Sequence, residues 1–400
     1  MSLRALLDDP GVARIFAALD GAGEDIRIAG GAVRDALLGR MPGEVDFATT
    51  ALPDEITRRA VAASLRTVPT GIAHGTVTVI VDGRPFEVTT LRRDVDTDGR
   101  HAIVAFGRDW AEDALRRDFT INGLFLDRDG QVHDFTGGET DLKARRVRFI
   151  GEARQRIRED YLRILRFFRF FAAYAQGEPD GDALAAVIAE RRGLERLSRE
   201  RIRAEIMKLL VAPRAPEAAR IMADAGLLGA VLAGVARPLH LARMTAIEAA
   251  LGRAPDALLR LGALGLFVAD NAERLRERLR LSNEETSRLH AMATRPPLTP
   301  SLSDQARKAA LYRRGEAAFR DAALLAWADS GADANDAAWR DLVALPDTWT
   351  APKFPLSGKD LAARGVAEGP AMGARLRDIE ERWIAAGFPD RDWIERELGT

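Results

Sequence analysis

The chain has 400 residues, nearly half of them apolar, which is enough for more than one domain with a buried core. Its 59 lysines and arginines balance 60 aspartates and glutamates, so there is no strong overall charge, and a nucleic-acid partner would need a local basic patch. Cysteine is absent, which excludes a disulfide framework and thiolate metal sites and suits a reducing compartment. The N-terminus has acids and a proline where a signal peptide would be apolar, and no later run could span a bilayer, so we expect a cytoplasmic protein.

Short runs of alternating apolar and polar residues predict strands within the first 140 residues. These runs lie in residues 25–31, 44–49, 75–91 and 123–135, and the last two each contain an Asp-Gly pair that is typical of a β-hairpin. Residues 31–39 and 52–65 have helical spacing, so we predict a mixed α/β sheet domain. From Asp141 onward, alanine, leucine, arginine and glutamate recur at helical spacing between proline- and glycine-rich breaks. The remainder is therefore predicted to be nearly all helix.

Two acids follow closely after a glycine pair. Gly30 and Gly31 end a predicted strand and open a helix, whose free N–H groups favour a phosphate, and Arg34 adds positive charge. Glu44 and Asp46 are two residues apart on a strand, so both project to one face. Hard oxygen ligands of this kind hold Mg²⁺ together with substrate phosphates. Either feature alone is usually structural, but together they predict a triphosphate site beside a metal site.

Glu87 lies on the second strand of a predicted hairpin. It contributes a third carboxylate if that strand neighbours the strand of Asp46, and it is an ordinary exposed strand acid otherwise. The sequence leaves both readings open.

Residues 91–102 are dense in charge and poor in apolar side chains, which predicts a mobile loop. A His-Asp dipeptide at residues 133–134 could suggest a metal phosphohydrolase, but the chain has only five histidines and none in a second cluster, so we interpret it as structural. Arginines and lysines concentrate in residues 143–169 and 191–208, with phenylalanines among the first group. They either pair with acids on solvated helices or provide footing for RNA phosphates.

Six segments in the first half of the chain resemble, in order, the class II nucleotidyltransferase family, which includes bacterial CCA-adding tRNA nucleotidyltransferases and their poly(A) polymerase relatives. The segments are residues 30–49, 74–79, 87–94, 116–127, 137–151 and 158–170, and residues 354–376 resemble a tail segment of the family more loosely. The resemblance implies a polymerase-beta-like α/β nucleotidyltransferase head followed by an all-α neck, body and tail. We place the catalytic head at residues 1–140, a base-recognising neck at 141–212, the body at 213–345 and an RNA-binding tail at 346–400.

The resemblance also implies roles for individual residues. The family uses two acids for two-metal catalysis, here Glu44 and Asp46, and Glu44 departs from its usual aspartate. Arg116, Arg117, Asp118 and Asn122 match the motif that contacts ribose and triphosphate, and a salt-bridged helix start is the structural alternative.

In the neck, Asp160 and Arg163 match the pair that reads the incoming base. Their spacing predicts two neighbours on one helix face, for which a simple surface ion pair is the alternative. Arg93, Asp94 and Arg100 match the loop that helps to switch from C to A addition.

These features predict an enzyme that adds CTP and ATP to the 3′ end of tRNA with Mg²⁺ and without a nucleic-acid template. A bacterial poly(A) polymerase is the first alternative, because it shares every head motif. A non-catalytic RNA- or nucleotide-binding protein on a decayed head is the second, suggested by Glu44 alone.

Overall fold

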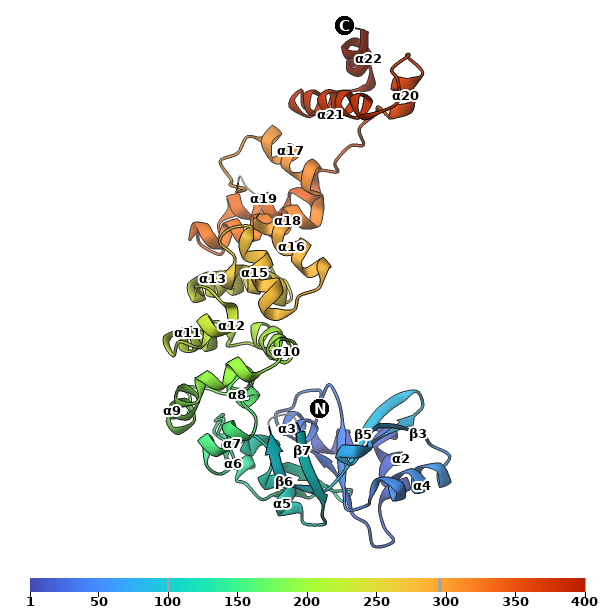
Figure 1. The fold of residues 1–400 in the computed structure, drawn as a ribbon, viewed down its shortest axis with the longest axis vertical. Coiled ribbons are helices and arrows are strands. Elements are labelled where there is room, and N and C mark those ends of the chain that lie inside the picture. The colour runs from blue at the N-terminus through green and yellow to red at the C-terminus, as the bar shows by residue number, and fades with distance from the viewer. Residues whose placement is uncertain (99–100, 294–296, 400) are drawn as a thin grey trace. The chain divides into compact units, whose positions relative to one another are not determined.

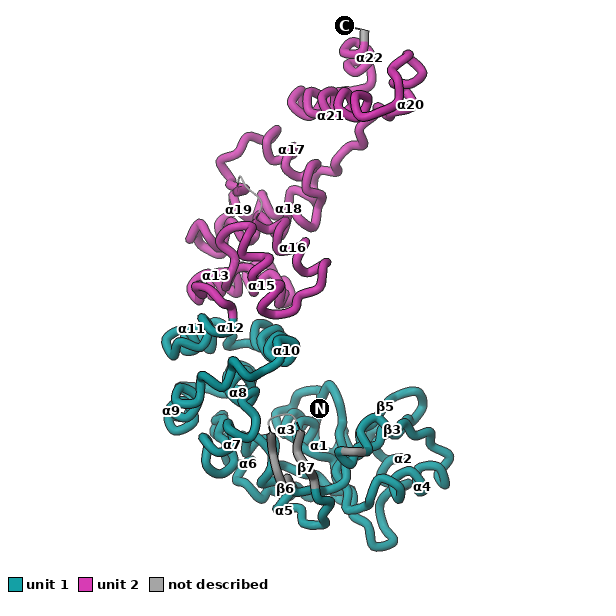
Figure 2. Tube along the Cα trace, viewed as in Figure 1, with its two compact units in different colours: residues 1–231 teal, residues 232–400 magenta. Residues whose placement is uncertain are grey.

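The computed structural model describes residues 1–98, 101–293 and 297–399, with side chains for all of these except residues 73, 94–98, 101–104 and 399. The chain forms two compact units, residues 1–231 and 232–400 (Figure 2). The first unit contains the predicted head and neck, and the finer four-part division stays a prediction.

The head is built on one seven-stranded sheet with the strand order β3-β4-β5-β2-β1-β8-β9. Its ribbon is coloured blue to teal in Figure 1. Its strands are β1 (Ile26–Ala29), β2 (Asp46–Thr49), β3 (Arg66–Gly71), β4 (Thr76–Val81), β5 (Arg84–Thr90), β8 (Leu124–Leu126) and β9 (Val132–Asp134). Strand β2 runs antiparallel to β1 and parallel to β5. The strand that carries Glu87 therefore neighbours the strand that begins at Asp46, which is the condition the sequence left open.

Helices accompany this sheet as predicted. In the head they are α1 (Leu3–Leu7), α2 (Pro10–Leu19), α3 (Gly31–Leu37), α4 (Pro53–Ala62), α5 (Trp110–Leu115) and α6 (Gly138–Lys143), with 3-10 turns η1 (Ile72–His74) and η2 (Thr120–Asn122). The core between α2 and the sheet contains Phe16, Phe47 and Phe86, whose rings pack edge to face at centroid distances of 5.4 and 6.1 Å. Val45 and Phe47 are buried whereas Glu44 and Asp46 are exposed, so the predicted alternation is confirmed.

Both predicted Asp-Gly hairpins are present. Strands β4 and β5 are joined by Asp82 and Gly83, whose φ angles of 51° and 82° suit the two-residue turn with positive φ at both positions. Strands β8 and β9 also pair antiparallel. Next to them, His133 Nε2 lies 2.7 Å from Asp127 Oδ2, so this histidine has a structural partner.

The mobile loop predicted for residues 91–102 is wrong for the described part of that segment. Strands β6 (Arg92–Asp98) and β7 (His101–Phe106) form a separate antiparallel pair. Charge density argues against burial, but it does not prevent pairing by backbone hydrogen bonds, and Val95, Thr97 and Ile103 are residue types that favour strands.

Further helices follow the head, and one side of α8 is buried against it. They are α7 (Ala153–Glu159), α8 (Leu162–Tyr174), α9 (Gly181–Ala189), η3 (Arg191–Arg196), α10 (Arg199–Leu210), α11 (Ala215–Asp224) and α12 (Leu227–Leu232). Phe119 is fully buried, with ring centroids 4.9 Å from Phe149 and 5.1 Å from Phe170, and Phe149 stacks on Phe167 at 5.8 Å. The phenylalanines of the arginine-rich run thus serve as core, and they fix α8 beside residues 118–122.

The second unit is all helical. It contains α13 (Pro238–Ala250), α14 (Ala257–Gly265), α15 (Asp270–Leu279), α16 (Asn283–Ala293), α17 (Asp304–Arg314), α18 (Glu316–Ser330), α19 (Ala337–Thr348), α20 (Gly358–Ala362), α21 (Pro370–Ala385) and α22 (Arg391–Gly399). Trp327 and Trp339 stack at 6.1 Å in one core, and Trp383 belongs to a second. Glu248 and Arg260 form a buried ion pair at 2.6 Å. The predicted α/β head followed by helices is confirmed.

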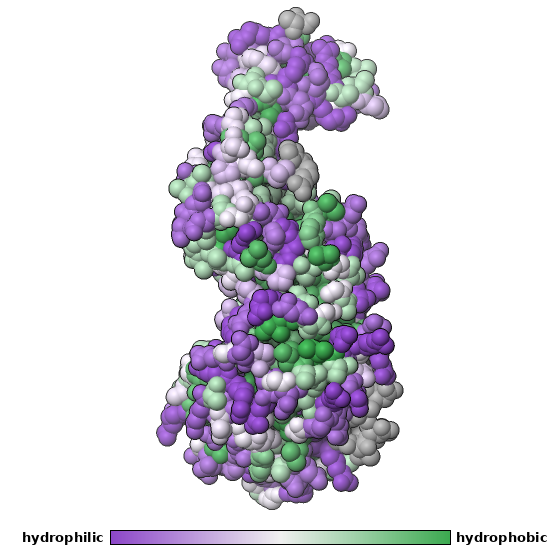
Figure 3. Space-filling model, turned by 90° about the vertical axis from the view of Figure 1, so that its left-hand side faces the viewer, coloured by the Kyte–Doolittle hydropathy of each residue, from purple (hydrophilic) through white to green (hydrophobic). Residues whose placement is uncertain are grey.

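Among the described residues no helix is long and apolar enough to cross a membrane. The face seen in Figure 3 is mostly hydrophilic, with smaller apolar patches between.

Candidate active site

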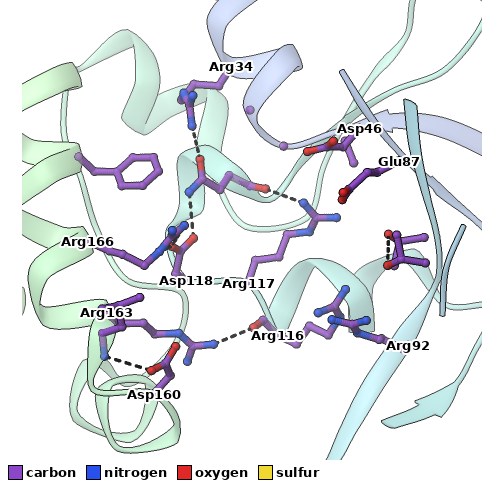
Figure 4. Close-up of a pocket in the computed structure, with 18 of the residues that line it drawn as sticks. Arg34, Asp46, Glu87, Arg92, Arg116, Arg117, Asp118, Asp160, Arg163 and Arg166 are labelled. Carbon is purple, nitrogen blue, oxygen red and sulfur yellow. Dashed lines mark hydrogen bonds and ion pairs between the residues drawn. The ribbon is translucent and has the colours of Figure 1, made fainter. Parts of the chain in front are cut away.

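A cleft of about 590 Å³ in the first unit collects most of the predicted site residues. Asp46 and Glu87 lie at one part of it, because β2 and β5 are parallel neighbours and both acids alternate with buried residues of their strands. Figure 4 shows the two side chains next to each other at the cleft. Two acids on adjacent strands can share a cation.

The electrostatics of Asp46 fit such a cation. Its pKa is raised to about 6, first because surrounding protein partly desolvates the carboxylate and then because Glu87 and Glu44 repel its charge, while Arg117 acts in the opposite direction. A divalent cation would relieve this repulsion. Glu44 precedes the strand, is exposed and does not line the cleft. Among the described side chains no group of three or more acids, histidines or cysteines is arranged to hold a metal by itself. Phosphate oxygens or water would therefore have to complete the coordination.

The glycine pair shapes the turn between β1 and α3. Gly30 has φ 63° and ψ −110°, and a Cβ atom at this position would lie 2.9 Å from Arg117 Nη1. Only glycine suits this conformation and this close approach. Both Gly30 and Gly31 line the cleft, but the Gly30 N–H donates to the Leu124 carbonyl at 2.8 Å. That N–H is therefore not available to the phosphate predicted here.

Arg34 belongs to a buried hydrogen-bond network that lines another part of the cleft. Its Nη1 donates to Asn122 Oδ1 at 2.6 Å, and Asn122 Nδ2 donates to Asp118 Oδ1 at 2.9 Å. Arg166 of α8 donates to the other Asp118 oxygen at 2.7 Å. Burial alone would raise the pKa of Asp118, but the charge of Arg166 and the hydrogen bond from Asn122 lower it below its usual range. Asp118 is consequently an anion that orders both partners.

Arg116 and Arg117 follow the end of α5 and share the buried Asp113. The two guanidiniums lie 2.7 and 3.0 Å from its carboxylate oxygens. Burial would raise the pKa of Asp113, but Arg117 and Arg116 outweigh it and lower the pKa. Both arginines also line the cleft, so their salt bridges are confirmed, while their contact with ribose and triphosphate stays a prediction.

The single helix predicted to carry Asp160 and Arg163 is wrong. Asp160 ends α7 with extended backbone, φ −152° and ψ 105°, and Arg163 lies in α8. An aspartate before a helix competes for backbone N–H groups, and Asp160 Oδ1 accepts from the Leu162 N–H at 3.1 Å. Its Oδ2 accepts from Arg201 at 2.7 Å.

Arg163 does not form the alternative ion pair with Asp160. Its Nη1 donates to Glu159 Oε2 at 2.6 Å and to the Arg156 carbonyl at 2.7 Å, and its Nη2 donates to the Arg116 carbonyl at 3.3 Å. Asp160 and Arg163 nevertheless line the same cleft, as Figure 4 shows.

Three arginines that line the cleft are missing from the sequence prediction: Arg92, Arg166 and Arg201. Arg166 and Arg201 lie in the arginine-rich runs, where only their long-range partners Asp118 and Asp160 distinguish them. Many other arginines of these runs are also paired with acids, such as Arg158 with Glu190 at 2.7 Å, so the ion-pair interpretation holds for them. Arg93 is exposed at the start of β6, and the side chains of Asp94 and Arg100 lie outside the described residues.

Residues 26–148 match the family model described as the poly A polymerase head domain, and residues 178–237 match the model described as a probable RNA and SrmB-binding site of polymerase A. A nucleotidyltransferase head with attached helices is the class that this fold and cleft define.

Curated relatives identify the family within the nucleotidyltransferase class. The chain is 36% identical over 376 residues to the mitochondrial CCA tRNA nucleotidyltransferase 1 of Mus musculus, covering 91% of this chain and 84% of the relative. It is 41% identical over 215 residues to the CCA-adding enzyme of Geobacillus thermodenitrificans, about half of each chain. The crystal structure of the Bacillus stearothermophilus CCA-adding enzyme in complex with CTP is 29% identical, with a TM-score of 0.72 and 94% of both chains covered. The chain belongs to the CCA tRNA nucleotidyltransferase family.

Proposed function

We propose that this chain completes tRNA by adding C, C and A to its 3′ end, with Asp46 and Glu87 at the reacting phosphate and Asp160 and Arg163 at the incoming base. The observation that carries the proposal is one cleft whose lining contains the neighbouring carboxylates Asp46 and Glu87, the further pair of Asp160 and Arg163, and several other arginines. Family membership supports the CTP, ATP and tRNA substrates.

We propose Mg²⁺ as the metal, held by Asp46 with Glu87, and with Glu44 reaching in from the segment before β2. Bound there, the ion would neutralise charge on the α-phosphate and on the leaving pyrophosphate. The protein contributes positioning: the strands fix the carboxylates, and Arg116 and Arg117 hold positive charge where the triphosphate would lie. Asp118 and Asn122 would orient the ribose.

Cytosine and adenine share a pairing pattern, an exocyclic amino donor beside a ring-nitrogen acceptor. Asp160 would accept from the amine, and Arg163 would donate to the ring nitrogen. Uracil and guanine present a carbonyl to the carboxylate and a protonated nitrogen to the guanidinium, so both contacts would become repulsive. A site that depends on hydrogen bonds rejects such substrates by orders of magnitude.

The test is incorporation by the purified chain with Mg²⁺, CTP and ATP on a tRNA that lacks its terminal triplet. We expect three added nucleotides and then a stop, and no incorporation by an Asp46→Ala variant. Long oligo(A) products on generic RNA would indicate the poly(A) polymerase alternative, and no incorporation with any divalent metal would indicate the binding-protein alternative.

We also propose a cytoplasmic location. Cell fractionation with an antibody against the chain tests it, and recovery in an organelle or membrane fraction would contradict it.

A further inference from the structure

Tyr174, the last residue of α8, contacts the head through its hydroxyl and its ring. The hydroxyl accepts from Arg34 Nη2 at 2.7 Å. The Arg34 guanidinium lies 4.1 Å from the centroid of the Tyr174 ring, a cation–π distance. Neighbouring Arg40 approaches the same ring at 5.1 Å. Tyr174 is therefore the point where the end of α8 holds α3.

These contacts close a ring of hydrogen bonds. The ring leaves α8 at Arg166, passes through Asp118, Asn122 and Arg34, and returns to α8 at Tyr174. Residues 166 and 174 are separated by about 12 Å of helix at 1.5 Å per residue. Asp118 and Asn122 are thus held from both ends by one rigid element.

The donors of Arg34 are nearly all committed within this ring. A guanidinium has five N–H groups. Nε and Nη2 donate to the two Asp35 oxygens at 3.0 Å each, Nη2 also donates to Tyr174, and Nη1 donates to Asn122. Only one Nη1 hydrogen is left for a ligand, so Arg34 acts mainly on Asn122 and contributes little direct binding.

We infer that Tyr174 is a positioning residue for nucleotide binding: its hydroxyl orients Arg34, and Arg34 in turn orients the Asn122 and Asp118 pair beside the ribose and triphosphate. The inference rests on the proposed function for the role of that pair. Losing the hydroxyl leaves one buried Nη2 hydrogen of Arg34 without its acceptor, while both bonds to Asp35 remain. The guanidinium is then held from fewer sides, which loosens its hold on Asn122. Base selection should not change, because Asp160 and Arg163 are not members of the ring.

The test compares Tyr174→Phe with Tyr312→Phe, which removes another hydrogen-bonded tyrosine hydroxyl, in the second unit. The dissociation constant for CTP is measured by calorimetry, and kcat and KM for CTP and UTP are measured on truncated tRNA. We expect Tyr174→Phe to raise both the dissociation constant and KM by about two- to tenfold, as for one lost hydrogen bond. We expect little change in kcat and an unchanged CTP to UTP ratio, with Tyr312→Phe equal to wild type.

Action through Arg34 is tested by a double-mutant cycle. Adding Tyr174→Phe to Arg34→Ala should give no further loss of CTP affinity, because the partner is already missing. Wild-type CTP affinity in Tyr174→Phe, or additive losses in the double variant, would overturn the inference. A wild-type chain that binds CTP but incorporates nothing would refute the proposed function, while the calorimetric cycle would still decide the role of Tyr174.

Discussion

Replacing Asp160 tests base reading most directly. The Asp160 carboxylate already accepts one bond from Arg201 and one from the Leu162 N–H. Each carboxylate oxygen can accept two hydrogen bonds, so capacity remains for the amine of an incoming base. Arg163 similarly keeps its Nε–H and one Nη2–H beyond the three bonds to Glu159, Arg156 and Arg116. The cleft can therefore supply one acceptor and one donor to a pairing edge without breaking the fold.

The magnitude follows from those bonds. A hydrogen bond that involves a charged group is worth about 1.5–3 kcal/mol, or roughly ten- to 150-fold in an equilibrium constant. Asp160→Ala should therefore lower kcat/KM for CTP and ATP by about that factor, while UTP, which gained nothing from the carboxylate, changes less. The CTP to UTP preference should fall accordingly.

Asp160→Asn is the sharper variant. An asparagine is nearly the same size and can still accept from the Leu162 N–H, but its amide can also donate. It should therefore admit the carbonyl of uracil, so that UTP use rises in absolute terms while CTP use falls. Efficiencies for all four nucleotides on one truncated tRNA give the answer. An unchanged CTP to UTP ratio in both variants would refute base reading at this position.

Three further outcomes are expected. Asp46→Ala and Glu44→Ala should each nearly abolish incorporation, since a bound metal stabilises the charge of the transition state by several kcal/mol, whereas Glu44→Asp should retain substantial activity. Binding of tRNA, measured by gel shift, should survive in all three variants, and wild-type turnover in Asp46→Ala would refute the metal assignment. Glu248→Ala removes the buried carboxylate 2.6 Å from Arg260 and should cost about 3–5 kcal/mol in urea unfolding. The exposed-pair control Asp224→Ala should cost less than about 1 kcal/mol, and equal losses would contradict this expectation. Burial raises the pKa of Asp141, but hydrogen bonds from Thr120, Arg148 and Arg146 outweigh burial and lower it. The carboxylate therefore stabilises the fold above its unfolded pKa of about 3.9, and this contribution is lost as pH falls through the folded pKa. Asp141→Asn should show a smaller fall in melting temperature below about pH 3.9 than the wild type, and equal falls would contradict this expectation.

Local patterns predicted the parts of the fold that depend on near neighbours. Alternation placed Val45 and Phe47 in the core, and the Asp-Gly pair at residues 82–83 fixed a hairpin. The i,i+3 spacing of Asp160 and Arg163 predicts one continuous helix, whereas an aspartate that precedes a helix is a local signal for the break that the structure has before α8. The charge of residues 91–102 predicts a loop, but the described part of that segment forms strands, because strand pairing needs no core.

The missed contacts are those between residues far apart in the chain. Tyr174 lies 140 residues from Arg34, and Arg166 lies 48 from Asp118. No periodicity within α8 separates an arginine that serves the cleft from one that covers the surface. The distinction arises only when the Phe119, Phe149 and Phe167 core presses the helix onto residues 118–122.

The same packing explains why overall charge carried no information about the substrate. The chain has a formal charge of −1, yet among the described residues the cleft lining contains seven arginines and only four acids, a net charge of about +3. Asp118 is paired with Arg166, and Asp160 is paired with Arg201. Glu87 lies beside the fourth acid, Asp46. Acids just outside the lining, namely Asp35, Asp113 and Glu159, pair with Arg34, Arg116, Arg117 and Arg163, so these pairs order the cleft and also offset part of its positive charge. The acids near Asp46 have no arginine ion pair among the described side chains, which is the arrangement that leaves them to a cation.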